Sequence, residues 1–542
     1  PPTSTLSTCT ALFRSARIDR RVAERWEGIE PARLTTDAEF ARRLYLDFAG
    51  RIPSIAELEA FLAEDDPNKR TALLDRLLAG EEFPRAQAEW LNALLLERRG
   101  DDPQWAAFLR RAAAKNLAWD AMVRGMLQAQ GDSEEYQGAA YFLTKRLVKE
   151  GAMAEVDTPG LARDVGRLFS GVDLQCAQCH DDLYVEDYRQ QDFQGLLFVF
   201  DNLQVKTGDA FPAVVEKLVT EPRPFMSVFK QQPRTTGPRI PGGEEIPIAV
   251  FPEGEEYLVP PDRKTKNPGV PKFSPLQEFA AELTKPDNRL FARNIANRLW
   301  FRLMGRGLVE PLDQFHGDNP PSDPVLLELL GDDLAAHGFD LRYFLRELAL
   351  TETYQRAAVY LQEELPPAEL HAVGLERRLS AEQLYWSIVT ATGAGDRLRE
   401  QAEAKEQSDD ELKLETAMER LVSGDSAHVN LQKSFLKMFS NPAREPETVY
   451  QPSVESALFL MHDASLLALL EPRPGNLMER CSELDDEAAV TRLFRAILSR
   501  DPTEEDRADA IAALQTLPES REAALRNLAW ALLASTEFCL NH

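Results

Sequence analysis

The residues of this sequence best suited to chemistry lie in "DLQCAQCHDD", where Cys176 and Cys179 are separated by two residues and His180 follows directly. In a Cys-x-x-Cys-His motif the two thiols can form thioether bonds to the two vinyl groups of one haem. The adjacent imidazole can then bind the iron. The spacing therefore predicts one covalently attached haem c, with His180 as the iron ligand on one face of the ring.

Zinc binding and thiol redox chemistry are the two alternatives for this motif. A structural zinc site needs four ligands, and the sequence contains no second Cys-x-x-Cys pair. Asp181 or Asp182 would have to complete the set from adjacent positions. A redox dithiol is expected at a strand end in a βαβ unit, whereas the flanking patterns here predict helices. Covalent haem is the favoured interpretation.

Further residues near the motif are candidates for contact with the haem. Met153 and Met226 are candidate iron ligands for the opposite face, although methionine more often packs in a core and an open position fits equally well. Arginine forks bind carboxylates, and an ordinary solvated basic edge is the alternative. The candidate propionate donors are Arg146, Arg163 and Arg167. The candidates for packing on the haem edge are Phe169, Leu174 and Tyr184.

Other chemically capable residues favour no specific activity. The segment "HGDNPPSDP" brings together His316, Asp318 and Asn319, which could line a site, but turn formation explains them equally well. Phosphate-loop, nucleophile-elbow and zinc-protease motifs are absent from the sequence, so enzymatic activity is left open, with haem-based redox chemistry as the one candidate. The remaining histidines are expected to be structural or exposed: His337, His371, His428, His462 and His542.

The charge of the chain limits its partners. Its 542 residues include 62 Lys and Arg against 89 Asp and Glu, a formal net charge of −27. Such a surface disfavours nucleic acid and anionic membranes and suits a basic protein partner. A run of eighteen apolar residues is absent from the sequence, so we expect no membrane span.

The start of the chain and its other cysteines are relevant to the cellular compartment in which the protein is expected. The sequence begins at Pro1 without methionine, and we expect that an upstream export signal has been removed. Cys9, Cys481 and Cys539 are the cysteines outside the motif. Two alternatives are open for these cysteines. Cys481 and Cys539 form a disulfide, or they are buried free thiols.

Helical periodicity dominates the chain and predicts a mainly all-α, multi-helical fold. One predicted helix, "TPGLARDVGRLFSG", ends at Gly171 just before the motif, and "QQDFQGLLFVFDNL" predicts another just after it. A charged helix is expected over 396–424, and a fixed-period repeat is not apparent in the sequence.

Residues 203–274 are rich in proline and glycine and predict an irregular β insertion, with strands over 246–251 and 255–261. The expected division is an N-terminal extension (1–29), a helical haem-bearing domain (30–202), an irregular β-containing connector (203–274) and a C-terminal helical domain (275–542).

Several long stretches carry a family resemblance, among them "RRLYLDFAGRIPSIAELEAFL", "LFSGVDLQCAQCHDD", "DNRLFARNIANRLWFRLMGRGLVEP" and "RRLSAEQL". From about residue 30 onward the chain resembles the large secreted cytochrome-like proteins of planctomycetes, which couple two domains of unknown function around one haem motif. The resemblance implies export to the periplasm or cell surface. It also suggests as partner a secreted protein resembling sulfatases and alkaline phosphatases, whose gene often lies nearby. The family commonly reads Cys-His-Asp-His-Pro from the second thiol, and here Asp182 stands in place of the second histidine.

These observations lead to three functional hypotheses. The first is an exported, single-haem c-type cytochrome-like protein that transfers electrons to or from a protein partner. The second is a structural or assembly component of an extracytoplasmic complex, with the haem as a covalent staple. The third is a haem redox enzyme with an open distal site.

Overall fold

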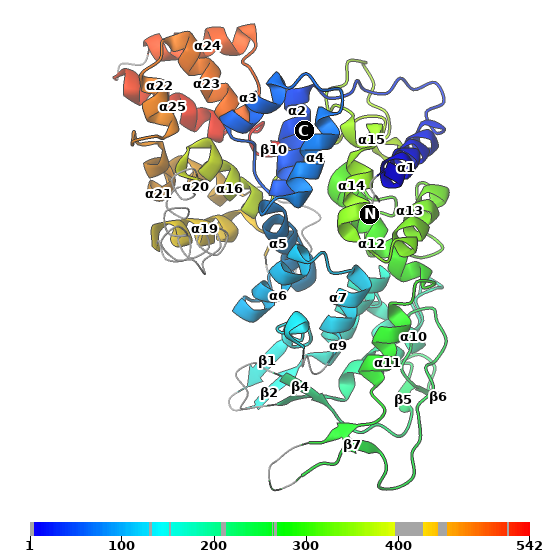
Figure 1. Ribbon diagram of the computed structural model, residues 1–542. Coiled ribbons are helices and arrows are strands. Elements are labelled where there is room, and N and C mark those ends of the chain that lie inside the picture. Colours follow the sequence, from blue (N-terminus) through cyan, green and yellow to red (C-terminus); the bar gives the residue numbers. More distant parts are fainter. Residues whose placement is uncertain are drawn as a thin grey trace. The chain divides into compact units, whose positions relative to one another are not determined.

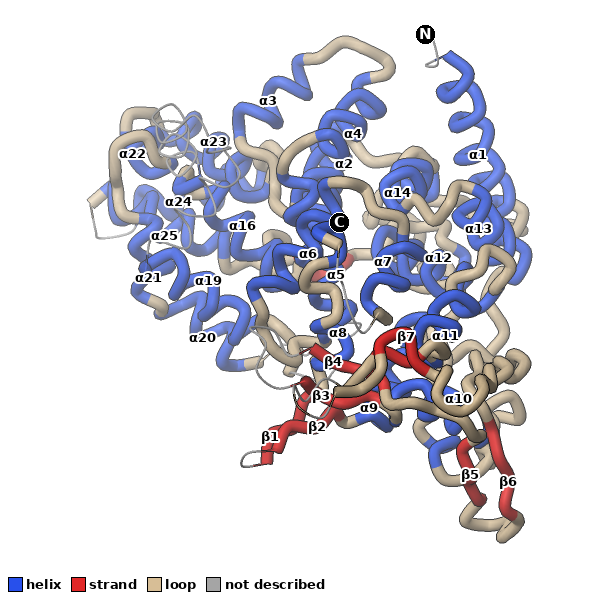
Figure 2. The backbone as a smooth tube through the Cα atoms, turned by 60° about the horizontal axis from the view of Figure 1, so that its bottom comes forward, coloured by secondary structure: helices blue, strands red, loops and turns tan. Residues whose placement is uncertain are grey.

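The computed structural model describes residues 5–128, 133–150, 153–206, 213–262, 264, 268–395, 426–442, 453–516 and 520–542. The expected mainly all-α fold is confirmed, because helices form most of the chain and the described strands pair only as two-stranded sheets (Figures 1 and 2). The charged helix expected over 396–424 lies outside the described residues. Among the helices in the described part, none is long and apolar enough to span a bilayer.

The chain folds into two compact units, and each unit combines two segments that are far apart in sequence. The first unit contains Pro1–Val22 and Trp90–Leu348, and the second contains Ala23–Glu89 and Ala349–His542. The sequence patterns instead predict four contiguous segments. That division stays a prediction, because the two units are defined by spatial proximity and not by sequence pattern.

The first unit carries the Cys-x-x-Cys-His motif. Its helices are α1 (Thr5–Ala23, reaching one residue beyond the unit), α6 (Pro103–Ala114), α7 (Trp119–Met126), η2 (Glu134–Tyr136), α8 (Tyr141–Thr144), α9 (Thr158–Val165), η3 (Gly166–Ser170), η4 (Cys176–Gln178), α10 (Gln190–Asp201), α11 (Pro275–Leu283), α12 (Arg289–Met304), α13 (Pro324–Ala336) and α14 (Leu341–Ala349). Helix α5 (Glu82–Leu96) crosses the boundary between the two segments assigned to different units.

Within its described residues, this unit contains four antiparallel strand pairs, and strands β1 to β7 are labelled in Figure 2. They are β1 (Leu147–Glu150) with β2 (Met153–Val156), β3 (Leu203–Lys206) with β4 (Ala213–Glu216), β5 (Arg223–Met226) with β6 (Pro233–Thr236), and β7 (Tyr257–Val259) with β8 (Val270–Pro271). Three of the four lie within the β insertion expected over 203–274. The strand expected over 246–251 is wrong, since no strand forms there. Pro247 removes a backbone donor from that stretch, which weakens any sheet ladder.

In its described residues, the second unit is helical apart from one short two-stranded sheet. Its elements are α2 (Asp37–Leu44), η1 (Tyr45–Ala49), α3 (Ile55–Ala63), α4 (Lys69–Ala79), α15 (Glu352–Gln355), η5 (Ala368–Leu370), β9 (Arg377–Arg378), α16 (Ala381–Ala391), α19 (Ser426–Phe439), α20 (Val454–His462), α21 (Ala464–Leu467), η6 (Ala468–Leu470), α22 (Leu477–Ser482), α23 (Asp486–Leu498), α24 (Glu504–Thr516), α25 (Arg521–Leu533) and β10 (Leu540–Asn541). Strands β9 and β10 pair antiparallel.

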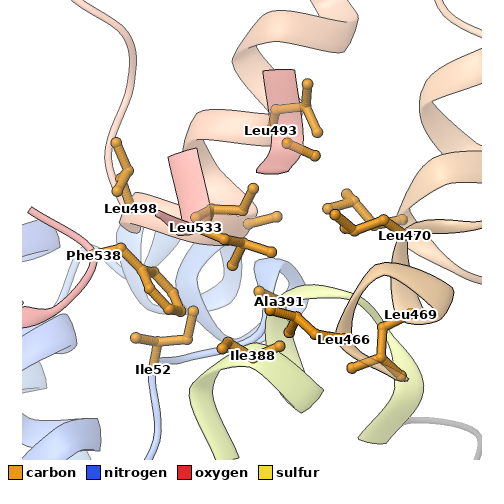
Figure 3. Close-up of a cluster of buried hydrophobic side chains, with 14 of the residues drawn as sticks. Ile52, Ile388, Ala391, Leu466, Leu469, Leu470, Leu493, Leu498, Leu533 and Phe538 are labelled. Atoms are coloured by element: carbon orange, nitrogen blue, oxygen red, sulfur yellow. The ribbon is translucent and has the colours of Figure 1, made fainter. Parts of the chain in front are cut away.

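Figure 3 shows the apolar core of the second unit. Ile52, from the segment before residue 90, packs there with Ile388 and Phe538 from the segment after residue 348. Buried apolar area is the main source of folding free energy. The two segments therefore depend on each other for this core.

A supersecondary motif occurs twice in the second unit, although the two copies share few identical residues. In the first copy helix α2 continues into the π-helix η1, ends at Gly50 with a positive φ of 68°, and leads through Arg51 and Pro53 to the N-cap Ser54 of α3. Ser54 forms a capping box with Glu57. A capping box satisfies two otherwise unpaired backbone donors.

The second copy repeats this order at the same spacing. Helix α23 ends at Ser499 with φ 58°, and Arg500 and Pro502 lead to Thr503 at the start of α24. The Thr503 hydroxyl accepts from the backbone N–H of Asp506, whose carboxylate accepts from the backbone N–H of Thr503. The helix–turn–helix is thus duplicated within one unit, which the search for a fixed-period repeat could not detect.

The arginine of each turn is bound in the same way. Arg51 donates to the capping-box carboxylate of Glu57 and to Glu82. Arg500 donates to the capping-box carboxylate of Asp506 and to Glu537. The two sites differ in solvent access, because the Arg51 side chain is 6% exposed and that of Arg500 is 29% exposed.

Replacing each arginine by methionine tests whether the buried ion pairs of Arg51 contribute more to the free energy of unfolding than the more exposed ion pairs of Arg500. We expect Arg51→Met to lower the free energy of unfolding by about 3 kcal/mol, because it removes a buried cation that donates to two carboxylates. Arg500→Met is expected to cost about 1 kcal/mol or less, as exposed pairs do. Urea titrations of the two variants measure the difference, and equal losses would contradict it.

The Arg51 pair also makes stability depend on pH. Burial alone would raise the pKa of Glu57, but its hydrogen bonds and ion pair with Arg51 hold that pKa down at about 2, below the ordinary 4.5. A carboxyl with a lower pKa in the folded state stabilises the fold above its unfolded pKa, and this stabilisation disappears as pH falls through the folded pKa. The gap in stability between wild type and Arg51→Met should therefore narrow as pH falls from about 5 to about 2.

Candidate functional site

The motif lies between two helices of the first unit, as the sequence predicts. Helix α9 passes into the π-helix η3, and the chain turns at Gly171, whose φ is 70°. A side chain at this position would meet the ring of Phe315 at 2.6 Å, so both the conformation and the space require glycine. Asp173 then accepts from the backbone of Gln175 just before η4 begins at Cys176.

Two glutamines of helix α10 hold the backbone of the motif. The Gln190 amide donates to the carbonyl of Cys179 at 3.0 Å and to the carbonyl of Met226 at 3.2 Å. One turn later, the Gln194 amide donates to the carbonyl of Gln178 at 3.1 Å. Both glutamines are buried. Sequence reasoning missed them, although two glutamines four residues apart, and therefore on one face of the predicted helix, were the available signal.

The reactive side chains of the motif remain accessible. Cys176 and Cys179 are exposed free thiols. The His180 Nδ1 lies 2.7 Å from the carbonyl oxygen of Asp181, so Nδ1 carries the proton that it donates. In a neutral imidazole this leaves the lone pair of Nε2 for an acceptor or a metal.

Asp182 is used for the turn that follows the motif. Its carboxylate accepts from the backbone N–H groups of Tyr184 and Val185. Burial alone would raise the pKa of Asp182, but these hydrogen bonds hold it below its ordinary value. Partial burial, followed by the charge of Asp182, raises the pKa of the Cys176 thiol.

The β5–β6 hairpin lies beside the motif. The backbone N–H of Val228 donates to the carbonyl of Cys179 at 3.1 Å, and the ring of Phe229 lies 4.7 Å from that of His180. Large apolar side chains near the motif are exposed, both on this hairpin and on the loop after the motif. We call them the motif patch: Leu183, Tyr184, Met226, Val228 and Phe229. Such a patch on a folded protein marks a surface that another group covers.

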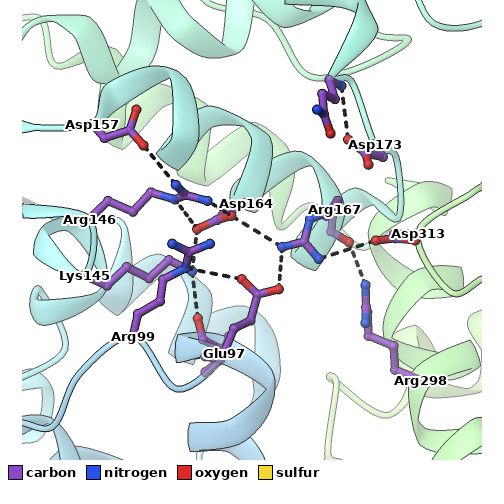
Figure 4. A network of polar contacts seen from close by, with 12 residues as sticks. Glu97, Arg99, Lys145, Arg146, Asp157, Asp164, Arg167, Asp173, Arg298 and Asp313 are labelled. Atoms are coloured by element: carbon purple, nitrogen blue, oxygen red, sulfur yellow. Dashed lines mark hydrogen bonds and ion pairs between the residues drawn. The ribbon is translucent and has the colours of Figure 1, made fainter. Parts of the chain in front are cut away.

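The three candidate propionate donors lie in different settings, and Figure 4 shows two of them, Arg146 and Arg167, in a network of polar contacts. Arg146 donates to both oxygens of Asp164 and to Asp157. Arg167 pairs with Glu97 at 2.5 Å and with Asp164 at 3.4 Å. Arg163 is half-buried, and its Nε has no hydrogen-bond partner. The forks of Arg146 and Arg167 are thus directed at carboxylates of the protein, and the propionate role of all three arginines stays a prediction.

The two candidate methionine ligands are placed differently. Met226 is exposed, and its backbone shares the Gln190 amide with the motif. Met153 begins strand β2, opposite Glu150 in β1, and its side chain lies outside the described residues. The structure therefore brings Met226 next to the motif and leaves Met153 untested.

His316 lies next to the loop that follows the motif. Its ring packs edge-on against Tyr188 with centroids 5.3 Å apart, and the neighbouring Gly317 donates to Asp187. The Asn319 amide donates to carbonyls of its own turn, as turn formation predicts, and Asp318 is exposed. Cys481 and Cys539 are free thiols on the core of the second unit, so the disulfide considered for them is not formed.

Zinc was the alternative use of the two thiols. Within the described residues, no group of three or more His, Cys, Asp or Glu side chains is arranged to hold a metal ion.

Two family models match the chain. PSCyt2, protein of unknown function (DUF1549), matches residues 17–205, and PSD1, protein of unknown function (DUF1553), matches residues 277–514. The two domains therefore occur in tandem, and the motif lies in the first of them. No curated protein and no solved structure matches the chain.

The two matched segments are interleaved in the structure. The first supplies residues to both compact units, and so does the second. In the first unit, Asn294 of α12 donates to the carbonyl of Leu168, next to the motif. In the second unit, the buried Arg42 donates to the carbonyl of Ile497. Each matched segment thus completes the other's core.

This interleaving predicts that the tandem domains do not fold separately. Cutting the gene at the exposed turn between Glu253 and Gly254 gives two fragments, each with one matched segment. We expect neither fragment alone to unfold cooperatively, and an equimolar mixture to regain the transition of the intact chain. Thermal unfolding followed by near-ultraviolet circular dichroism measures this.

The control is the intact chain cleaved at an engineered protease site in the same turn after folding. It should keep its transition, because both units are already assembled. A fragment 254–542 that unfolds cooperatively at the wild-type temperature would contradict the interleaved arrangement.

Proposed function

We propose that this chain, which carries the DUF1549 and DUF1553 domains in tandem, is a single-haem c-type cytochrome-like protein that exchanges electrons with a protein partner. The observation that carries the proposal is the geometry at Cys176, Cys179 and His180. Both thiols are exposed while the backbone that bears them is held by buried glutamines. When bound, haem would supply a one-electron couple between ferric and ferrous iron.

The histidine of the motif is arranged as a metal ligand would be. Ligating histidines commonly donate their other ring nitrogen to a carbonyl or carboxylate, which fixes the tautomer and the ring orientation. His180 makes this contact through Nδ1 and the carbonyl of Asp181. Nε2 is therefore the nitrogen that would face the iron.

Two residues of the motif patch, Val228 and Phe229, would supply an apolar surface for the porphyrin. An exposed apolar patch is costly in water unless another group covers it. Val228 and Phe229 belong to a hairpin that is hydrogen-bonded to the motif backbone, so they lie close enough to pack on a ring attached there. We assign Met226, on the same hairpin, as the ligand on the second iron face.

We assign the protein to the periplasm or cell surface, since the resemblance to secreted planctomycete proteins implies export. The same resemblance suggests a secreted sulfatase- or phosphatase-like neighbour as one partner.

Haem attachment is tested by producing the chain in a bacterium that assembles c-type cytochromes. We expect the purified protein to keep one haem after denaturation and acid extraction, because thioether bonds survive both. Cys176→Ala/Cys179→Ala should lose it, whereas Cys481→Ala, which removes a buried thiol elsewhere, should keep it. A wild-type chain without covalent haem would exclude the proposal.

The same two proteins, the wild type and the double cysteine variant, distinguish the electron-transfer proposal from the staple hypothesis. If the haem is a staple, the double cysteine variant does not fold and the wild-type haem does not exchange electrons with other redox proteins. If the proposal is right, the double variant keeps the helical circular dichroism of the wild type, because the motif backbone is held by hydrogen bonds that need no haem.

The second iron ligand is tested with a matched pair of methionine variants. We expect Met226→Ala to abolish the near-infrared sulfur-to-iron band of the ferric protein and to let carbon monoxide bind the ferrous form. Met153→Ala should change neither spectrum. A Met226→Ala variant with the wild-type spectrum would show that Met226 is not a ligand.

A further inference from the structure

The loop from Asp182 to Tyr188 is closed by its own hydrogen bonds. The backbone N–H of Asp182 donates to the carbonyl of Tyr188 at 2.8 Å, and the N–H of Tyr188 donates to Val185 at 3.1 Å. Inside the loop, the carboxylate of Asp182 accepts from two backbone donors, one of them Tyr184 at 2.8 Å. A loop fixed in this way loses little conformational entropy when a partner binds it.

The tip of this loop presents two apolar side chains to solvent. Leu183 is 66% exposed and Tyr184 is 90% exposed, whereas Tyr188 at the base is buried against His316. The exposed apolar side chains at the tip bury little area, so they contribute little to the free energy of folding. Exposed tyrosine with an apolar neighbour is typical of the centre of a protein–protein interface.

Carboxylates surround this tip. Glu186 and Asp187 lie on the loop itself and are exposed, and the exposed Asp318 follows Gly317, whose N–H donates to Asp187. Exposed cations nearby include Arg189, Lys230 and Arg234. Lys230 lies 4.0 Å from the carboxylate of Asp181, and Arg234 donates to Gln191. The local charge is negative, in line with the net charge of −27 on the whole chain.

We propose that the loop 182–188 is the docking site of a basic, lysine-rich redox protein. The proposal rests on the proposed function, because the docked partner would exchange one electron with the haem beside the loop. The iron of one protein is oxidised as that of the other is reduced, and no further reactant is needed. Complementary charge steers the encounter, and the apolar tip supplies the contact that remains after water is expelled.

Other occupants fit this surface less well. A second copy of the chain would bring like charges together, which costs free energy at an interface. Nucleic acid and anionic lipid are repelled by the same carboxylates.

The test uses the haem-loaded full-length protein and a basic single-haem cytochrome as the probe, with electron exchange followed by stopped-flow absorbance. We expect Leu183→Ser/Tyr184→Ser to lower the second-order rate constant about tenfold, as the loss of a central interface contact does. The matched control is Leu361→Ser, which removes an 86% exposed leucine in the other unit and should have no effect.

Two matched charge-reversal variants complete the test. Glu186→Lys should slow the exchange severalfold at low salt, and this effect should vanish near 0.5 M salt, where screening is strong. Glu363→Lys makes the same change of net charge at an exposed position in the other unit and should have a much smaller effect. Equal effects of the two reversals, or a double serine variant as fast as Leu361→Ser, would overturn the docking site.

Failure of docking can be distinguished from failure of the proposed function. Haem content and reduction by dithionite are measured first for every variant. If both are normal and the loop variants have no effect, the docking site is wrong and the proposed function stands. If the wild type carries no haem, the proposed function is wrong, and calorimetric binding of the same basic cytochrome to the loop variants and their controls decides the docking site.

Discussion

The buried carboxylate of Asp164 is the interaction on which the motif region depends. It lies in helix α9, is about 1% exposed, and pairs with Lys145, Arg146 and Arg167. Burial alone would raise the pKa of Asp164, but these three cations hold it well below its ordinary value. Breaking a buried pair leaves an unpaired charge in the protein, at a cost of about 3–5 kcal/mol. The helix that leads into the motif therefore cannot shift without separating several charges.

This network also explains why the second matched segment matters to a motif in the first. Arg298 of α12 donates to the carbonyl of Arg167, and Asn294 donates to the carbonyl of Leu168. Both carbonyls lie in the π-helix η3, and the Arg167 carbonyl also accepts from the backbone N–H of Gly171 at 3.2 Å. The two side chains of α12 that bind these carbonyls are buried. The turn at Gly171, and with it the direction in which Cys176 leaves the helix, is thus set by residues more than a hundred positions away.

Local patterns predicted the parts of this site that are local in sequence. The helix before the motif, its end at Gly171, the helix after it and the β insertion all follow from apolar spacing, glycine and proline. The pairing of Arg167 with Glu97 was not predictable in this way, because the two residues are 70 positions apart and nothing near either one specifies the other. The same limit applies to Gln190, whose two acceptors become neighbours only after the β5–β6 hairpin has folded onto the motif. The duplicated turn escaped detection because its copies share a spacing of turn residues rather than a sequence.

Asp182 is the position where the resemblance described above leads us to expect a second histidine, and the structure shows what its carboxylate does. A carboxylate can accept two backbone N–H groups at once, whereas a neutral imidazole offers one acceptor. Asp182 accepts from the backbone N–H groups of Tyr184 and Val185, and these hydrogen bonds help to close the loop that carries Leu183 and Tyr184. In the proposed haem site this position therefore builds a recognition loop instead of offering a nitrogen to iron. Met226 of the β5–β6 hairpin is the residue that we propose would supply the second ligand, and Gln190 ties its backbone to the motif through a single amide.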